Sequence, residues 1–316
     1  MKQLRVIDIK QAVSWAGTVL MVLALLFISR RLLSMWHDLE LSILANPWVL
    51  GVFLLVVLAE GTAIILASIN FRALLANISG VVVAPPLATM TYARSNLYKY
   101  IPGGVMYVLG RNQMAIETEA LGHGKVFLAT ALEGVFIAVA AFILSTIYTF
   151  DYAIYYFRQL DLSPLAGLIL GLALLAAIPL LYCFRHRLLT ILSGLKKDST
   201  VLRPTVLAKR LAFALGQTNL SAGTFLSTLI ILGQPMTVNL GTTVMGLFIL
   251  SWLAGFLTPG APSGLGVREA VLLMFLSGTL DEGILLLTVV MHRALLVVGD
   301  VAAYLMVLAY TRVKGR

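Results

Sequence analysis

Two stretches rich in glycine and proline, each with an arginine nearby, interrupt a chain whose other segments are apolar over membrane-spanning lengths. The candidate binding residues of the first stretch are Lys99, Tyr100, Pro102, Gly103, Gly104 and Arg111. Those of the second stretch are Pro259, Gly260, Gly264, Gly266, Arg268 and Glu269. Broken backbone persists inside a membrane only where protein or a polar cavity satisfies its free N–H and C=O groups. The two stretches therefore predict a binding site built at the ends of half-helices.

The second stretch has the features of an anion site. Its prolines exclude regular helix until about Gly266 or Val267, where we expect a helix to restart with Glu269 in its first turn. The free N–H groups and the dipole of that helix would attract an anion such as phosphate. Arg268 adds a charge that can bind two phosphate oxygens at once. The alternative is a turn in which Arg268 pairs with Glu269 or with another carboxylate.

The first stretch repeats this pattern of broken backbone beside basic side chains. Its proline and glycines stop one helix and permit another to start, with Arg111 on the continuing segment. Arg94 and Lys99 precede the break and lie roughly adjacent on a helix. The alternative is that these three basic side chains extend to the lipid headgroups, as they do near helix ends.

Further ionisable residues lie well inside predicted membrane spans. They are Glu60, Glu133, His292, Arg293 and Asp300. A charge at such depth costs at least about 2.5–3.5 kcal/mol on insertion scales unless it is paired or hydrated. One interpretation is an ion pair that joins helices, with Arg293 bound to Glu133 or Glu60. The other interpretation is that these residues line a polar passage.

Composition identifies the class of protein. The chain has 316 residues, of which 60% are hydrophobic and only 12% are charged, and its mean hydropathy is +0.96. A soluble domain of this length needs far more polar surface. We therefore expect an all-α, polytopic integral membrane protein that forms a single domain over residues 1–316. The net charge of +9 fits cytoplasmic loops and anionic lipid better than nucleic acid.

The hydropathy pattern predicts about eight membrane crossings and two broken, re-entrant segments. An amphipathic helix is expected to lie at the interface over about 30–46, and the broken segments cover about 85–111 and 258–278. The predicted spans are 12–29, from Pro47 to about 70, 126–149, 164–184, 211–233, 236–257 and 283–310. Because each half contains one break, the halves are candidate inverted repeats.

Basic loops predict the orientation of these spans. The loop over 185–210 is rich in lysine and arginine, as are both ends of the chain, so all three are expected on the cytoplasmic side. The loop over 150–162 carries Asp151 and Asp161 with only Arg158, so it is expected to face outward. Two cytoplasmic termini require an even number of crossings, which agrees with the predicted eight.

At the two breaks the chain resembles the lysylphosphatidylglycerol synthase transmembrane-region family. That family includes the flippase half of bacterial multiple-peptide-resistance factors. The resemblance is carried by Asn96-Leu97-Tyr98-Lys99-Tyr100-Ile101-Pro102-Gly103-Gly104 with Gly110-Arg111, and by Pro259-Gly260-Ala261-Pro262-Ser263-Gly264-Leu265-Gly266-Val267-Arg268-Glu269. It implies a multi-pass protein of the bacterial cytoplasmic (inner) membrane that handles lipids. The chain ends at Arg316, where the full-length factors continue into an aminoacyltransferase domain, so lysyl transfer is expected to be absent.

These observations favour a lipid translocase over two alternatives. In the leading hypothesis, half-helix ends and arginines hold the phosphate of an anionic or polyprenyl-phosphate-linked lipid. The first alternative is a non-catalytic partner that docks a cytoplasmic glycosyltransferase on the basic 185–210 loop. The second is a membrane-embedded lipid-modifying enzyme, for which Glu133, Glu269 and His292 are the candidate acids and bases. The spacing of these residues predicts no catalytic triad, no metal site and no cofactor.

Overall fold

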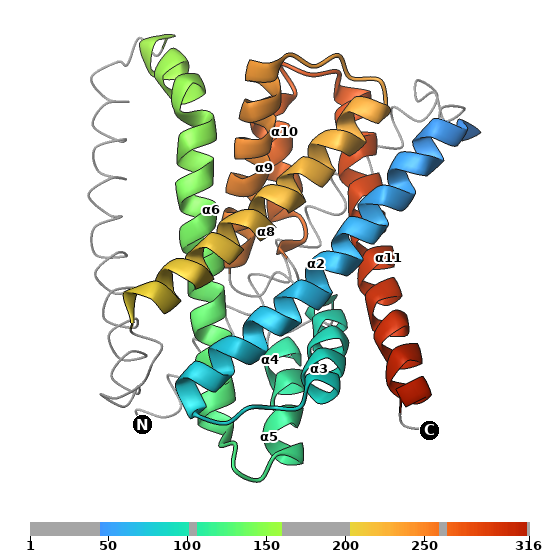
Figure 1. The fold of residues 1–316 in the computed structure, drawn as a ribbon. Coiled ribbons are helices and arrows are strands. Elements are labelled where there is room, and N and C mark those ends of the chain that lie inside the picture. Colours follow the sequence, from blue (N-terminus) through green and yellow to red (C-terminus); the bar gives the residue numbers. More distant parts are fainter. Residues whose placement is uncertain (1–44, 101–105, 160–202, 259–263, 315–316) are drawn as a thin grey trace, which may run out of the picture.

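The computed structural model describes residues 45–100, 106–159, 203–258 and 264–314, and the regular elements in these ranges are all helices (Figure 1). The prediction of an all-α protein is therefore confirmed. The predicted spans at 12–29 and 164–184 lie outside the described residues, as does the interfacial helix at 30–46 except for its last two residues. Five candidate site residues also lie outside them: Pro102, Gly103, Gly104, Pro259 and Gly260.

Five long helices form the body of the described structure (Figure 1). They are α2 (Pro47–Ser79), α6 (His123–Gln159), α8 (Pro204–Ile231), α9 (Val238–Leu257) and α11 (Glu282–Lys314). Four of them, namely α2, α6, α9 and α11, are long and apolar enough to cross a membrane. The predicted number of about eight crossings is not confirmed by this part of the chain.

Short helices fill the two regions where the sequence predicts broken segments. They are α3 (Pro85–Leu97), the 3₁₀ turn η2 (Tyr98–Tyr100), α4 (Met106–Arg111), α5 (Gln113–Glu117) and α10 (Val267–Leu276). The predicted restart of a helix at Gly266 or Val267, with Glu269 in its first turn, is confirmed. The described parts of both broken segments therefore contain short helices.

Local sequence accounts for both ends of α2. Pro47 occupies the first turn, and the Asn46 side chain accepts a hydrogen bond from the Trp48 N–H. The helix continues past the end of the span predicted near Asn70, and Arg72 in this extension donates through Nε to the Val83 carbonyl at 2.6 Å. It ends at Gly80, whose φ of 72° is the left-handed conformation that favours glycine.

The two broken segments enter the molecule from opposite ends. In Figure 1, α3 and α4 lie beside each other at the end where α2 finishes and α6 begins. The helices α9 and α10 also pack against each other, and α10 runs toward the opposite end, where α11 begins. The helix α9 is long enough and apolar enough to cross a membrane, in agreement with the span predicted at 236–257, and α10 packs against it.

Glycines allow the closest helix contacts. A Cβ on Gly110 would lie 2.7 Å from the Tyr98 ring, so α4 can close onto α3 only without a side chain there. The long helices α2 and α11 meet in the same way, since a Cβ on Gly299 would lie 2.8 Å from the Glu60 Cβ. Gly61 faces the same crossing, 3.7 Å from the Gly299 carbonyl when a Cβ is built on it.

Apolar side chains cover both the inside and the outside of the bundle. One core contains the stacked rings of Phe225 and Phe248, and a second surrounds the fully buried Phe71. Large apolar residues on α2 and α6, such as Leu55 and Phe142, are exposed. A helix that is apolar all round is typical of a membrane span. The fold therefore has the surface of a helical membrane protein.

Candidate functional site

The first broken segment is attached to α11 through one buried carboxylate. Asp300, which is 3% exposed, binds the Lys99 ammonium at 2.7 Å and accepts a hydrogen bond from the Asn96 amide at 2.7 Å. The Tyr100 hydroxyl donates to Oδ2, the oxygen that also binds Lys99, whereas Asn96 donates to Oδ1. Asp300 thus holds the end of α3 and the η2 turn against the middle of the last helix.

The second broken segment is attached to the same helix two turns earlier. Glu269 accepts a hydrogen bond from the Gly266 N–H at 2.7 Å and binds the Arg293 guanidinium at 2.6 Å. The expectation that Arg293 pairs with Glu133 or Glu60 is therefore corrected to Glu269. The sequence could not predict this pair, because Glu269 lies beside α11 only in the folded arrangement of α10 and α11. The two oxygens of Glu269 bind the Gly266 N–H and Arg293, and the alternative ion pair between Arg268 and Glu269 does not form.

Arg268 is the basic residue of the second segment that has no carboxylate partner among the described residues. Its Nε is buried without a hydrogen-bond partner in this part of the chain, and its guanidinium lies 5.7 Å from the centre of the Trp252 ring. The two broken segments, far apart in sequence, are therefore both attached to α11, at positions two turns apart.

The place of Arg268 depends on a contact between two glycines. Gly264 has a φ of 68°, and a Cβ on it would lie 2.8 Å from the Gly255 Cα and 2.9 Å from the Arg268 Nε. We expect Gly264→Ala to destabilise the protein by about 2 kcal/mol or more, from left-handed strain and steric overlap. Thermal unfolding in detergent measures this loss. Gly278→Ala is the matched control, because a Cβ there has no neighbour within 4 Å; equal melting temperatures for the two variants would contradict the contact.

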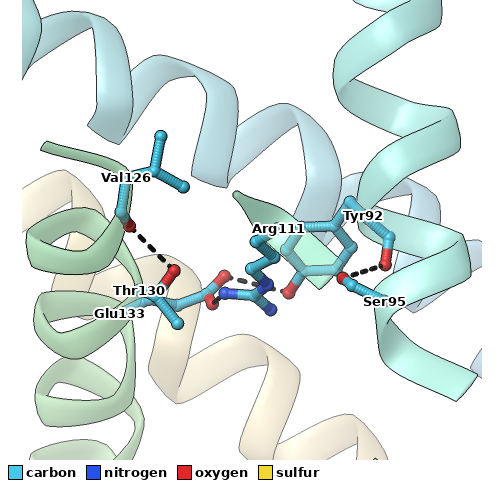
Figure 2. A network of polar contacts seen from close by, with 6 residues as sticks. All are labelled: Tyr92, Ser95, Arg111, Val126, Thr130 and Glu133. Carbon is cyan, nitrogen blue, oxygen red and sulfur yellow. Dashed lines mark hydrogen bonds and ion pairs between the residues drawn. The ribbon is translucent and has the colours of Figure 1, made fainter. Parts of the chain in front are cut away.

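Arg111 forms a separate buried ion pair (Figure 2). Its guanidinium binds Glu133 of α6, and the Tyr92 hydroxyl donates to the other oxygen of the same carboxylate at 2.9 Å. The guanidinium also lies over the rings of Phe71, Tyr92 and Tyr107, at 4.7, 4.2 and 5.6 Å from their centres. Arg111 is only 5% exposed. The alternative in which Arg111 extends to the lipid headgroups therefore does not hold, because its charge is paired with Glu133 inside the bundle.

A third polar network joins α2, α8 and α11. The Thr224 hydroxyl lies 3.2 Å from a Glu60 carboxylate oxygen and 3.1 Å from the His292 Nε2. The His292 ring is 2% exposed and meets the rings of Phe225 and Phe248 edge-on. Sequence reasoning identified Glu60 and His292 but missed Thr224, because a threonine inside an apolar helix gives no signal of its own.

The polar centre of the bundle contains three basic and three acidic side chains, but only two of each form ion pairs in the described ranges. Lys99, Arg268 and Arg293 carry positive charge, and their acidic counterparts are Glu60, Glu269 and Asp300. Asp300 and Glu269 are each committed to one cation, and Arg268 and Glu60 are left without an ion pair in the described ranges. These ranges also contain no group of three or more His, Cys, Asp or Glu able to hold a metal ion.

The fold and this polar centre define a helical membrane protein with charged groups held inside its bundle. No protein-family model matches the chain, and no curated protein matches it. The resemblance to the lysylphosphatidylglycerol synthase transmembrane-region family therefore stays a prediction from the two motifs. Functional conclusions depend on the geometry of the centre.

Proposed function

We propose that this protein is a lipid translocase of the flippase kind, acting on a lipid with an anionic or sugar-bearing phosphate headgroup. The observation that carries the proposal is the buried Arg268 at the start of α10, whose Nε has no hydrogen-bond partner among the described residues. A basic side chain buried in a membrane protein is rarely without a function. In this proposal the lipid phosphate supplies the anion that Arg268 lacks, and the lipid tails stay in the bilayer.

The arrangement of the two broken segments supports this proposal. They start from opposite ends of the bundle and are both anchored on α11, at Asp300 and Arg293. Such half-helices, with their ends near mid-depth, form substrate sites in transporters that work by alternating access. Glu133 and Glu269 are both held in ion pairs, so the geometry favours binding over acid–base catalysis.

We expect Arg268→Ala to reduce lipid translocation by about tenfold or more, because a hydrogen-bonded charge contributes about 1.5–3 kcal/mol. Purified protein in vesicles of phosphatidylcholine and labelled phosphatidylglycerol provides the measurement, with dithionite quenching of the label as readout. Arg312→Ala is the matched control, since Arg312 is exposed near the end of α11. Vesicles in which wild-type protein moves phosphatidylglycerol no faster than protein-free vesicles would overturn the proposed function.

A further inference from the structure

The Thr224 hydroxyl is the centre of a hydrogen-bond network that constrains where protons lie. Its oxygen is 2.8 Å from the Ser221 carbonyl, 3.1 Å from the His292 Nε2 and 3.2 Å from the Glu60 Oε1. A threonine hydroxyl donates one hydrogen and accepts through two lone pairs. If all three neighbours were acceptors, only one could receive the hydroxyl hydrogen, and the other two would face lone pairs of the Thr224 oxygen.

The distances assign the single hydroxyl proton. The Ser221 carbonyl has no proton of its own and is the nearest neighbour, so Thr224 donates to it. The other two contacts are then favourable only if His292 and Glu60 bring protons. We propose that Glu60 is a proton-binding site, in which a protonated carboxyl group donates to Thr224 beside a neutral His292 protonated on Nε2.

The charged groups that act on Glu60 come from two other elements, η2 and α11. Lys99 of η2 and Asp300 of α11 act on it with opposite signs. The Lys99 ammonium is bound to Asp300 at 2.7 Å, so its charge is already largely neutralised. Arg268 and Arg293 are the charged groups that act on His292. The helix α6 meets α2 through apolar side chains, and α3 meets it through neutral Thr89.

Coupling between this proton site and lipid binding adds to the proposed function and rests on it. With Glu60 protonated, the central group of three cations and three carboxyls has one uncompensated positive charge, which is at Arg268. That state favours an anionic headgroup. Loss of the proton restores neutrality and weakens anion binding. Because coupling between two sites is reciprocal, the bound lipid phosphate also favours the proton. The protein would therefore bind the proton and the anionic lipid together.

Infrared difference spectroscopy tests the proton site independently of transport. A pH jump on detergent-purified wild-type protein should give a carbonyl band from a buried protonated carboxyl group, and Glu60→Gln should lack this band. Thr224→Val should shift the band, because it removes the hydrogen-bond partner. The control is Glu119→Gln, which changes an exposed carboxylate. Identical difference spectra for wild type and Glu60→Gln would overturn the proton site.

A second measurement tests the coupling to phosphatidylglycerol. In vesicles containing that lipid, wild-type translocation should fall by about tenfold per pH unit once Glu60 loses its proton. Glu60→Gln should keep the low-pH rate across the same range. Wild-type and Glu60→Gln profiles that coincide would overturn the coupling. Absence of translocation at every pH contradicts the proposed function instead, and the infrared result still decides whether Glu60 binds a proton.

Discussion

Replacing Glu133 with alanine is expected to destabilise the protein by about 3–5 kcal/mol, the usual cost of breaking a buried ion pair by removing one partner. Arg111 would be left 5% exposed in an aromatic cage without its counter-ion. The Tyr92 hydroxyl would lose its acceptor as well. Thermal or denaturant unfolding of purified protein in detergent, followed by circular dichroism, measures the change.

A second variant separates the charge from the packing. The double change Arg111→Met with Glu133→Leu removes both charges and keeps apolar volume, so it should recover most of the lost stability. Glu119→Ala, on an exposed segment, should have an effect within about 0.5 kcal/mol of zero. A Glu133→Ala variant as stable as the Glu119→Ala control would show that the pair in Figure 2 does not carry a buried charge.

Replacing Asp300 with alanine is expected to detach the first broken segment from α11 and to cost about 3 kcal/mol. Asn96 and Tyr100 each lose the acceptor that they share. Lys99 contributes less to this cost, because its side chain is 32% exposed and regains some hydration. Hydrogen–deuterium exchange should therefore rise in α3 and η2, while the exchange of α9 stays close to that of wild type.

Two comparison variants make this result specific. Asp151→Ala removes an exposed carboxylate and should leave exchange in α3 unchanged. Lys99→Met with Asp300→Leu removes the charge pair together and should recover part of the stability, with Tyr100 and Asn96 still unsatisfied. Equal exchange in α3 for Asp300→Ala and Asp151→Ala would refute the attachment through Asp300.

Local signals in the sequence predicted helices and their breaks well. Pro47 marks the start of α2, and the glycines before Val267 mark the start of α10, because these residues act on their own backbone. The end of α2 was predicted too early, and Arg72 in the extension donates to a carbonyl in the following loop. The span predicted at 236–257 corresponds to α9, because an apolar run of this length is typical of a membrane-spanning helix.

Site residues were identified one by one, but their pairing was not. Glu133, Glu269 and Asp300 were recognised as ionisable groups at membrane depth, yet each could bind any of several cations. Asp300 and Asn96 are separated by 204 positions, and only the packing of α3 on α11 brings them together. The role of a neutral side chain such as Thr224 is even harder to predict from sequence, because threonines inside helices commonly hydrogen-bond to the backbone of their own helix.

The crossing of α2 and α11 has a mechanical consequence. These helices meet at Gly61 and Gly299, and the side chain of Glu60 leaves from the same point. If the proposed translocation involves rocking of α2 over α11, this close contact is the natural pivot, and the helices would separate at one membrane face as they close at the other. Glu60, which lies beside the pivot, would then move less than the ends of the two helices.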